Sequence, residues 1–92
     1  MKQVSFRTAL KILGAKSIKI TRRDDEELAT VVGGQSSDVI RQLFKDGEIY
    51  SVVYYKNNFH LRERARIQNY GKNCNMDFGI EWALKEAGYI LR

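Results

Sequence analysis

Residues 24–47, with the sequence DDEELATVVGGQSSDVIRQLFKDG, decide the fold that we predict for this chain. Asp24 and, three residues later, Glu27 form a capping-box-like start to a helix, and the acidic first turn suits the positive end of the helix dipole. Gly33 and Gly34 then form a tight turn, after which a second helix follows. The expected buried positions are Leu28, Val31 and Val32 in the first helix and Val39, Ile40, Leu43 and Phe44 in the second.

Residues 48–67, EIYSVVYYKNNFHLRERARI, predict a β-hairpin directly after these helices. The first half is rich in β-branched and aromatic residues, which favour strands, and residues 56–58 supply a polar tip. Apolar and basic residues then alternate from Phe59 to Ile67, as expected for a strand with one buried face. A short helix through residues 61–67 is the competing interpretation, because these residue types also suit helices.

The flanking segments complete one domain of residues 1–92. Ser5 can cap a first helix that Gly14 ends, and residues 17–21 alternate as a short strand. A last helix is predicted over residues 77–88. The expected fold class is therefore α+β, with the order α-β-α-α-β-β-α.

Length and composition exclude several classes of protein. A chain of 92 residues with 43% hydrophobic content forms one small core, and no apolar run approaches the ~20 residues of a membrane span. The basic N-terminal stretch is no convincing signal peptide. Cys74 is the single cysteine and His60 the single histidine, so an internal disulfide is excluded and a zinc site nearly so. We expect a cytoplasmic protein without metal or cofactor.

The charge is distributed unevenly along the chain. The formal net charge is +5, but residues 1–23 contain seven Lys and Arg and no acidic residue. Residues 24–48 carry a net charge of −5, and residues 49–76 carry +4. The basic N-terminal arm and hairpin suit a polyanionic partner, whereas the acidic start of the helix at residue 24 would repel phosphates.

The stretch from Ser5 to Ile67 resembles the winged helix-turn-helix family in the order and spacing of its elements. Ala29, a glycine of the Gly33-Gly34 pair, Ile40 and Leu43 occupy positions like those of the small, turn and buried residues in that family. If Gly33 is the turn glycine of the family, Ala29 matches but the later buried position falls on Gln42. If Gly34 is the turn glycine, Ile40 and Leu43 match but Ala29 lies one residue too early. The resemblance implies sequence-specific binding of double-stranded DNA, and the size and basicity are similar to those of small transcriptional regulators of phages and mobile elements.

In such a protein the second helix of the pair enters the major groove. The side chains available there are Gln35, Ser36, Ser37, Asp38, Arg41, Gln42 and Lys45. Arg41 can contact guanine and Gln42 adenine, each contributing ~1–3 kcal/mol of discrimination. Ser36 and Ser37 can contact phosphates. The alternative is that these residues have no role in binding: the serines only cap the helix, and Arg41 only pairs with Asp38 or is solvated.

The hairpin is the second predicted contact, as a wing on the flanking backbone or minor groove. Its candidate DNA-binding residues are Lys56, Asn57 and Asn58 at the tip and His60, Arg62, Arg64 and Arg66 along the second strand. An ordinary solvated sheet face is the alternative. Tyr54 and Tyr55 beside this row raise the further alternative of single-stranded nucleic acid or RNA bound by stacking.

Two remaining hypotheses concern partners. Phe78, Trp82 and the tail of residues 89–91 are candidate dimer contacts, and a dimer would read half-sites about one helical turn apart. Otherwise this last helix only packs under the first. The rival function is a protein-interaction module, an inhibitor or adaptor, that uses the acidic helix surface. The chain shows no nucleophile-base cluster and no phosphate-binding loop motif, so we predict no enzymatic activity.

Overall fold

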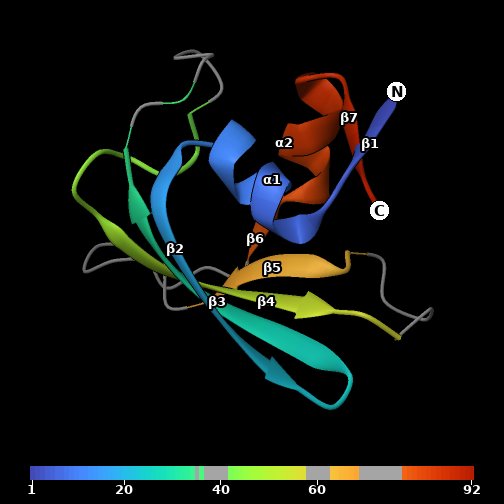
Figure 1. The fold of residues 1–92 in the computed structure, drawn as a ribbon. Helices are drawn as coiled ribbons and strands as arrows, with labels where there is room; N and C mark the ends of the chain where they lie inside the picture. Colours follow the sequence, from blue (N-terminus) through green and yellow to red (C-terminus); the bar gives the residue numbers. More distant parts are fainter. Residues whose placement is uncertain (35, 37–41, 58–62, 69–77) are drawn as a thin grey trace.

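The computed structural model describes residues 1–34, 36, 42–57, 63–68 and 78–92. These residues form mostly strands, with two short helices (Figure 1). In chain order the elements are β1 (Lys2–Val4), α1 (Phe6–Ile12), β2 (Ala15–Arg23), β3 (Glu26–Gly33), β4 (Ile49–Tyr55), β5 (Ala65–Gln68), β6 (Phe78–Gly79), α2 (Glu81–Glu86) and β7 (Tyr89–Leu91). The predicted winged helix-turn-helix fold, with its order α-β-α-α-β-β-α, is therefore wrong.

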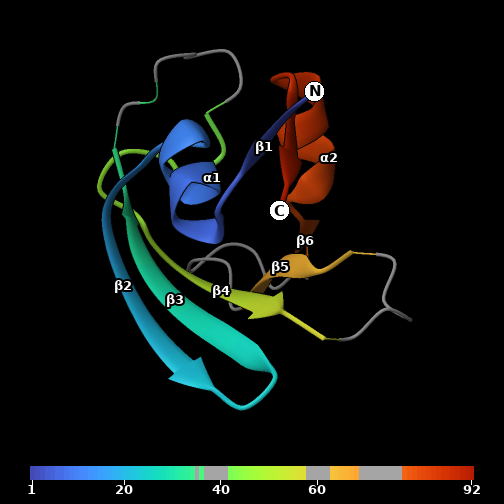
Figure 2. The same cartoon turned by 45° about the vertical axis from the view of Figure 1, so that its right-hand side comes forward.

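The main element of the described residues is an antiparallel sheet of five strands. Its strand order is β2-β3-β4-β5-β6, and β1 pairs separately with β7 in parallel. Both helices and the β1–β7 pair lie on the same side of this sheet (Figures 1 and 2). The core fills the space between them, and its largest fully buried side chains are Phe44, Leu10, Leu13, Ile67, Ile80, Leu84, Val31 and Val52.

The largest correction concerns the acidic segment that was predicted to be a helix. Residues 26–33 form β3, in which Glu27, Ala29 and Val31 are buried and the residues between them are more exposed. This alternation has the period of a strand, and the β-branched run of residues 30–32 favours a strand over a helix. Strands pair with β3 along both of its edges. Asp24 and Asp25 form the turn of the β2–β3 hairpin instead of a helix start.

The second predicted helix is also not helical where the structure describes it. Residues 42–48 form loop and turn, and the backbone N–H groups of Leu43 and Phe44 donate to the carbonyl of Leu13 at 2.9 and 3.1 Å. A Cβ atom at Gly33 would lie 1.8 Å from the carbonyl oxygen of Lys45, so the glycine permits this loop to approach β3. Residues 35 and 37–41 of the predicted helix lie outside the described residues.

The antiparallel pairing predicted within residues 48–67 is present, but its setting differs from a projecting wing. In β4 and β5, Val52 pairs with Ile67 and Tyr54 with Ala65. Ala65 and Ile67 are fully buried, as expected. Because β3 and β6 flank these two strands, they are interior strands of the sheet.

Both ends of the chain contain a helix, of which the first was predicted closely. Ser5 accepts a hydrogen bond from the backbone of Thr8 at the start of α1, and Gly14 has a φ of 112° after its end. The last helix, α2, covers residues 81–86 of the predicted 77–88, and residues 78–79 belong to β6 instead. The predicted apolar tail of residues 89–91 forms β7.

Candidate nucleic-acid interface

Basic side chains gather on α1 and on β2, which is an edge strand within the described part of the chain. The two elements lie beside each other, and the guanidinium of Arg7 on α1 donates to the carbonyl of Ile18 on β2 at 3.4 Å. Lysine on an exposed edge strand also discourages pairing with another strand. We call the following six exposed side chains the basic surface: Arg7, Lys11, Lys16, Lys19, Arg22 and Arg23.

Acidic side chains neutralise this surface incompletely. Lys16 lies 3.4 Å from Asp46, Arg22 lies 3.4 Å from Glu27, and Arg23 lies 3.8 Å from Glu26. Arg7, Lys11 and Lys19 form no ion pair with any described residue. The basic surface therefore retains a net positive charge, which suits a polyanion.

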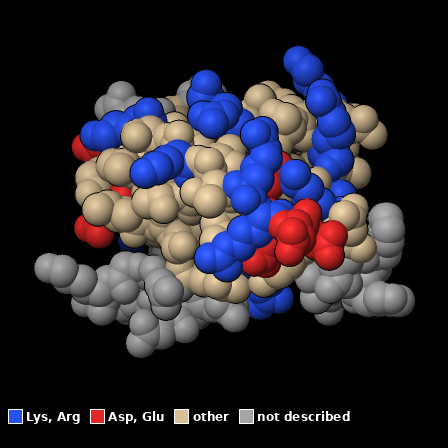
Figure 3. Space-filling model, turned by 60° about the horizontal axis from the view of Figure 1, so that its bottom comes forward, with Lys and Arg blue, Asp and Glu red and all other residues tan. Residues whose placement is uncertain are grey.

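The cations project to both sides of the edge strand. Ile18 and Ile20 of β2 pack against the core, so Lys19 and Arg23 lie on the opposite face of the sheet, whereas Arg22 lies on the helix side. Figure 3 shows one face of the molecule, with Lys and Arg side chains spread across it and the largest group of acidic side chains confined to one place. A ligand that spans the edge of the sheet can therefore meet cations from either face.

An open hollow of about 520 Å³ adjoins the basic surface where α1, β2 and β4 meet. We call it the junction hollow. Its lining residues are Ser5, Phe6, Arg7, Ile20, Arg22, Glu27, Tyr54, Lys56 and Arg92. The rings of Phe6 and Tyr54 stack with centroids 5.0 Å apart, and the hydroxyl of Tyr54 donates to the backbone oxygen of Arg92 at 2.9 Å. The hollow thus combines an apolar side with several cations.

Glu27 is the single acidic residue in the lining of the junction hollow. Its side chain is 12% exposed, and its carboxylate lies 2.8 Å from Lys56 Nζ and 3.4 Å from Arg22 Nε. Burial by itself would raise the pKa of Glu27, but the hydrogen bonds and positive charges of Lys56 and Arg22 outweigh that effect and lower it. Glu27 is therefore ionised at neutral pH and pairs with both cations.

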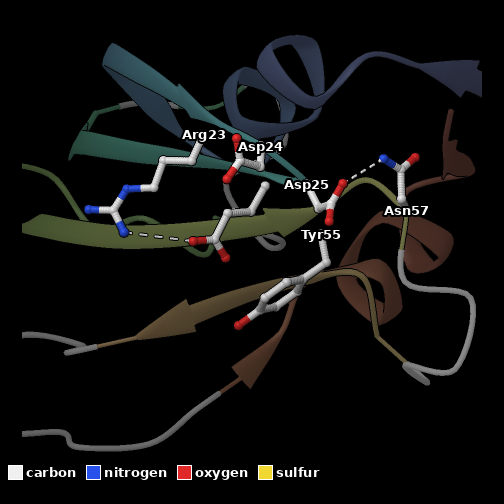
Figure 4. Close-up of a pocket in the computed structure, with 6 residues that line it drawn as sticks. Arg23, Asp24, Asp25, Tyr55 and Asn57 are labelled. Atoms are coloured by element: carbon white, nitrogen blue, oxygen red, sulfur yellow. Dashed lines mark hydrogen bonds and ion pairs between the residues drawn. The ribbon is translucent and has the colours of Figure 1, made fainter.

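A second hollow, of about 480 Å³, marks the acidic end of the β2–β3 hairpin (Figure 4). Its lining residues are Arg23, Asp24, Asp25, Glu26, Tyr55 and Asn57. The side-chain amide of Asn57 donates to Asp25 at 3.0 Å, which ties the hairpin turn to the end of β4. Because acids outnumber the single arginine here, phosphates would be repelled. The acidic residues that were expected to repel phosphates are concentrated at this turn and at Glu27.

Of the residues predicted to form a recognition helix, those that the structure describes do not lie in a helix. Gln35, Ser37 and Arg41, together with Asp38, lie outside the described residues. Ser36 is 8% exposed, and the side chain of Gln42 donates to the backbone oxygens of Gly34 and Phe44. Lys45 is exposed on the loop before β4.

The residues predicted to form a wing are used in different ways. Asn58, His60 and Arg62 lie outside the described residues, whereas Lys56 lines the junction hollow and Asn57 bonds to the hairpin turn. The guanidinium of Arg64 donates to the carbonyl of Leu91 at 2.8 Å. Arg66 alternates with the buried residues of β5 and so lies on the face of the sheet away from the helices. Among the predicted contact residues that the structure describes, Lys56 is the one that lies at the candidate interface.

Arg92 and all six residues of the basic surface were absent from the candidate contacts predicted from the sequence. The signal for these six was present in the charge count, because residues 1–23 contain seven basic residues and no acid. Arg92 carries no such signal, since β7 places it beside the hollow only through pairing with β1.

The predicted dimer contacts differ in exposure. Trp82 on α2 is 60% exposed and Ile90 on β7 is 36% exposed, whereas Leu91 is 4% exposed and belongs to the core. Phe78 lies in β6, where its backbone pairs with that of Ile67. Self-association through Trp82 and Ile90 stays a prediction.

The comparisons with known proteins leave the assignment to the structure. No protein-family model matches the chain, and no match was found among curated proteins or solved structures. Neither helix of the described residues has the length or apolar character needed to cross a membrane. Across the same residues, no three His, Cys, Asp or Glu side chains are grouped in a way that could hold a metal ion.

Proposed function

We propose that the protein binds double-stranded DNA through the basic surface of α1 and β2. The observation that supports this is that six exposed cations from an acid-free stretch of sequence share one helix and the adjoining edge strand. Neutralising phosphates releases counterions, and this release drives binding without requiring base contacts.

The dimensions of β2 suit a duplex. Nine residues at ~3.3 Å each extend over roughly 30 Å, which is close to one turn of DNA. Lys19 and Arg23 lie on one face of this strand, four residues and so ~13 Å apart. Arg22, Arg7 and Lys11 lie on the helix side, so a duplex at the edge of the sheet can bring several phosphates to the basic surface.

Sequence specificity and transcriptional regulation, in a small regulator of phage or mobile-element type, belong to the same proposal. Lys and Arg can contact guanine as well as phosphate, so the basic surface has donors for both kinds of contact. Selection from random duplexes tests this part separately. A recovered consensus sequence would support a regulator, and recovery of unrelated sequences would indicate binding to the backbone alone.

The acidic helix surface that the rival interaction module requires does not form, because residues 26–33 are a strand. Asp24 and Asp25 lie in a turn, Glu26 pairs with Arg23, and Glu27 faces the junction hollow. Binding of RNA or single strands remains an outcome of the experiment on DNA. Tyr54, one of the two tyrosines considered for stacking, is occupied by its contacts with Phe6 and Arg92.

The test compares duplex binding across salt concentrations for two matched double variants. Lys11→Gln with Lys19→Gln removes two cations of the basic surface, and Lys2→Gln with Lys85→Gln removes two exposed lysines of β1 and α2. Loss of two phosphate contacts should reduce the slope of log K against log salt by about 2 for the first variant and leave it unchanged for the second. Absence of duplex binding at low salt, or an equal loss in both variants, would contradict the proposal.

A further inference from the structure

We propose that the junction hollow binds the phosphate monoester of a nucleotide, either free or at the end of a nucleic-acid strand. The strand-end form rests on the proposed function, because it names the part of the bound DNA that this hollow would hold. A free nucleotide offers the same chemical group, so the experiment below separates the two sources.

Cations from four separate elements converge on the hollow. Arg7 comes from α1, Arg22 from the end of β2, Lys56 from the segment after β4, and Arg92 from the segment after β7. Positions this far apart in the sequence are brought together by the fold, whereas the other cations of the basic surface follow one another along the chain. The convergence forms a concentrated positive site next to a more extended one.

The balance of charge favours a monoester over the internal diesters of a nucleic acid. Four basic side chains and the single carboxylate of Glu27 leave a formal side-chain charge of +3 in the lining. A phosphate monoester carries a charge of about −1.5 to −2 at pH 7, with a second pKa of about 6. An internal phosphodiester carries about −1, as one charge per phosphate of the backbone requires. The monoester also offers more oxygen atoms to the arginine guanidinium groups.

Size and surface chemistry suit a nucleotide rather than a bare anion. The hollow has a volume of about 520 Å³, within the ~300–1,000 Å³ range of small-molecule sites. Phe6, Ile20 and Tyr54 contribute apolar surface next to the cations. A sugar or base can therefore contact these residues while the phosphate meets the basic side chains.

Glu27 would compete with the ligand for its cations. The Arg22 side chain is 76% exposed and lies 3.4 Å from the carboxylate, so it can turn from Glu27 to a phosphate at little cost. The Lys56 side chain is 34% exposed and lies 2.8 Å from Glu27, so it is held more firmly. Removing the negative charge of Glu27 should therefore strengthen phosphate binding, an effect that a purely structural role would not produce.

The experiment uses the full chain with two pairs of probes. The first pair is one duplex of about 16 base pairs with either 5′-phosphate or 5′-hydroxyl ends, and the second is deoxyadenosine 5′-monophosphate and deoxyadenosine. We expect the phosphorylated duplex to bind about tenfold more tightly than the hydroxyl form, and the monophosphate to bind where the nucleoside does not. Affinity for the monoester should rise between about pH 5 and pH 7.5, as its second ionisation proceeds.

Three variants test the assignment to this hollow. Arg22→Gln should reduce the preference for the phosphorylated probes several-fold, Glu27→Gln should increase their affinity, and Lys85→Gln should leave it unchanged. Thermal unfolding of each variant shows whether the fold is retained. Should Glu27→Gln unfold, Arg22→Gln still decides the question, because its exposed side chain contributes little to folding.

The outcomes separate this proposal from the proposed function. Equal affinity for phosphorylated and hydroxyl duplexes, with no binding of the monophosphate, overturns the monoester site and leaves duplex binding intact. Binding of the monophosphate without any duplex binding assigns the hollow to free nucleotides and overturns the proposed function. Tighter binding of the phosphorylated duplex supports the strand-end form.

Discussion

Arg22 and Arg64 each lie near a glutamate at a similar distance, but their surroundings differ. Arg22 Nε lies 3.4 Å from Glu27 and its side chain is 76% exposed. Arg64 Nε lies 3.6 Å from Glu81 and its side chain is 29% exposed. The Arg64 guanidinium also donates to the backbone oxygens of Leu91 and Arg92 at 2.8 and 3.4 Å.

This difference indicates which arginine is available to a ligand. An exposed ion pair contributes ~0–1 kcal/mol, whereas hydrogen bonds to charged groups in a partly buried setting contribute ~1.5–3 kcal/mol. Arg64, directly before β5, therefore connects the start of this strand to the end of β7 and stabilises the fold. Arg22 can exchange its carboxylate partner for a phosphate, so ion-pair distance alone does not identify a binding residue.

The largest expected effect is the loss of stability on changing Arg64 to Gln. The change removes the ion pair with Glu81 and the bonds to two backbone oxygens, so we expect the free energy of unfolding to fall by about 2 kcal/mol. For a domain of this size the melting temperature should decrease by roughly 10 °C. Thermal unfolding by circular dichroism measures the shift. An unchanged melting temperature would remove the structural role assigned to Arg64.

Changing Glu27 to Gln should reduce stability less than the change at Arg64 does, and it should increase the affinity for phosphate instead of reducing it. The charged partner of Lys56 and Arg22 is lost, so we expect about 1–2 kcal/mol of destabilisation. Glu26→Gln is the matched control, because Glu26 pairs at 3.8 Å with the exposed Arg23 and should change stability by less than about 0.5 kcal/mol. The melting temperatures of the two variants, measured together, give the comparison. Equal shifts would show that Glu27 has no special role in the hollow.

The pH dependence of stability should identify the same carboxylate. Folding lowers the pKa of Glu27 below its ordinary value of 4.5. The ionised carboxylate is therefore more stable in the folded state than in the unfolded chain. This stabilisation is complete above pH 4.5 and is lost as the pH falls through the folded pKa. Urea unfolding of the protein and of Glu27→Gln at several pH values should show their difference in stability shrinking toward acidic pH. A difference that stays constant would contradict the lowered pKa.

The smallest stability change is expected for Arg22→Gln, which completes the comparison with Arg64. Removing its exposed ion pair should lower the free energy of unfolding by less than about 0.5 kcal/mol. Loss of one phosphate contact should nevertheless reduce the slope of log K against log salt by about 0.9 for a duplex. Urea unfolding and a salt titration on the same sample measure the two effects. Strong destabilisation with unchanged binding would show that Arg22 and Arg64 have the same role.

Part of the fold was predictable because some signals are local. Ser5 caps α1 and Gly14 follows its end in a left-handed conformation, and both depend on residues within a few positions. The strand character of residues 49–55 follows in the same way from their side chains. Local sequence signals could not show that the second and third predicted helices were wrong. Leu28, Val31 and Val32 suit helical spacing, whereas Glu27, Ala29 and Val31 suit a strand.

By itself, the sequence determined the opening helix and the acid-free, strongly basic stretch of residues 1–23. Charge and capping are properties of neighbouring residues, so they can be identified without the fold. The tertiary structure decided that residues 26–33 form a strand, because β2 and β4 satisfy their backbone hydrogen bonds on both sides. It also placed Lys56 and Arg92 beside Arg22 while directing Arg64 to Glu81, because both arrangements depend on contacts between segments far apart in the chain.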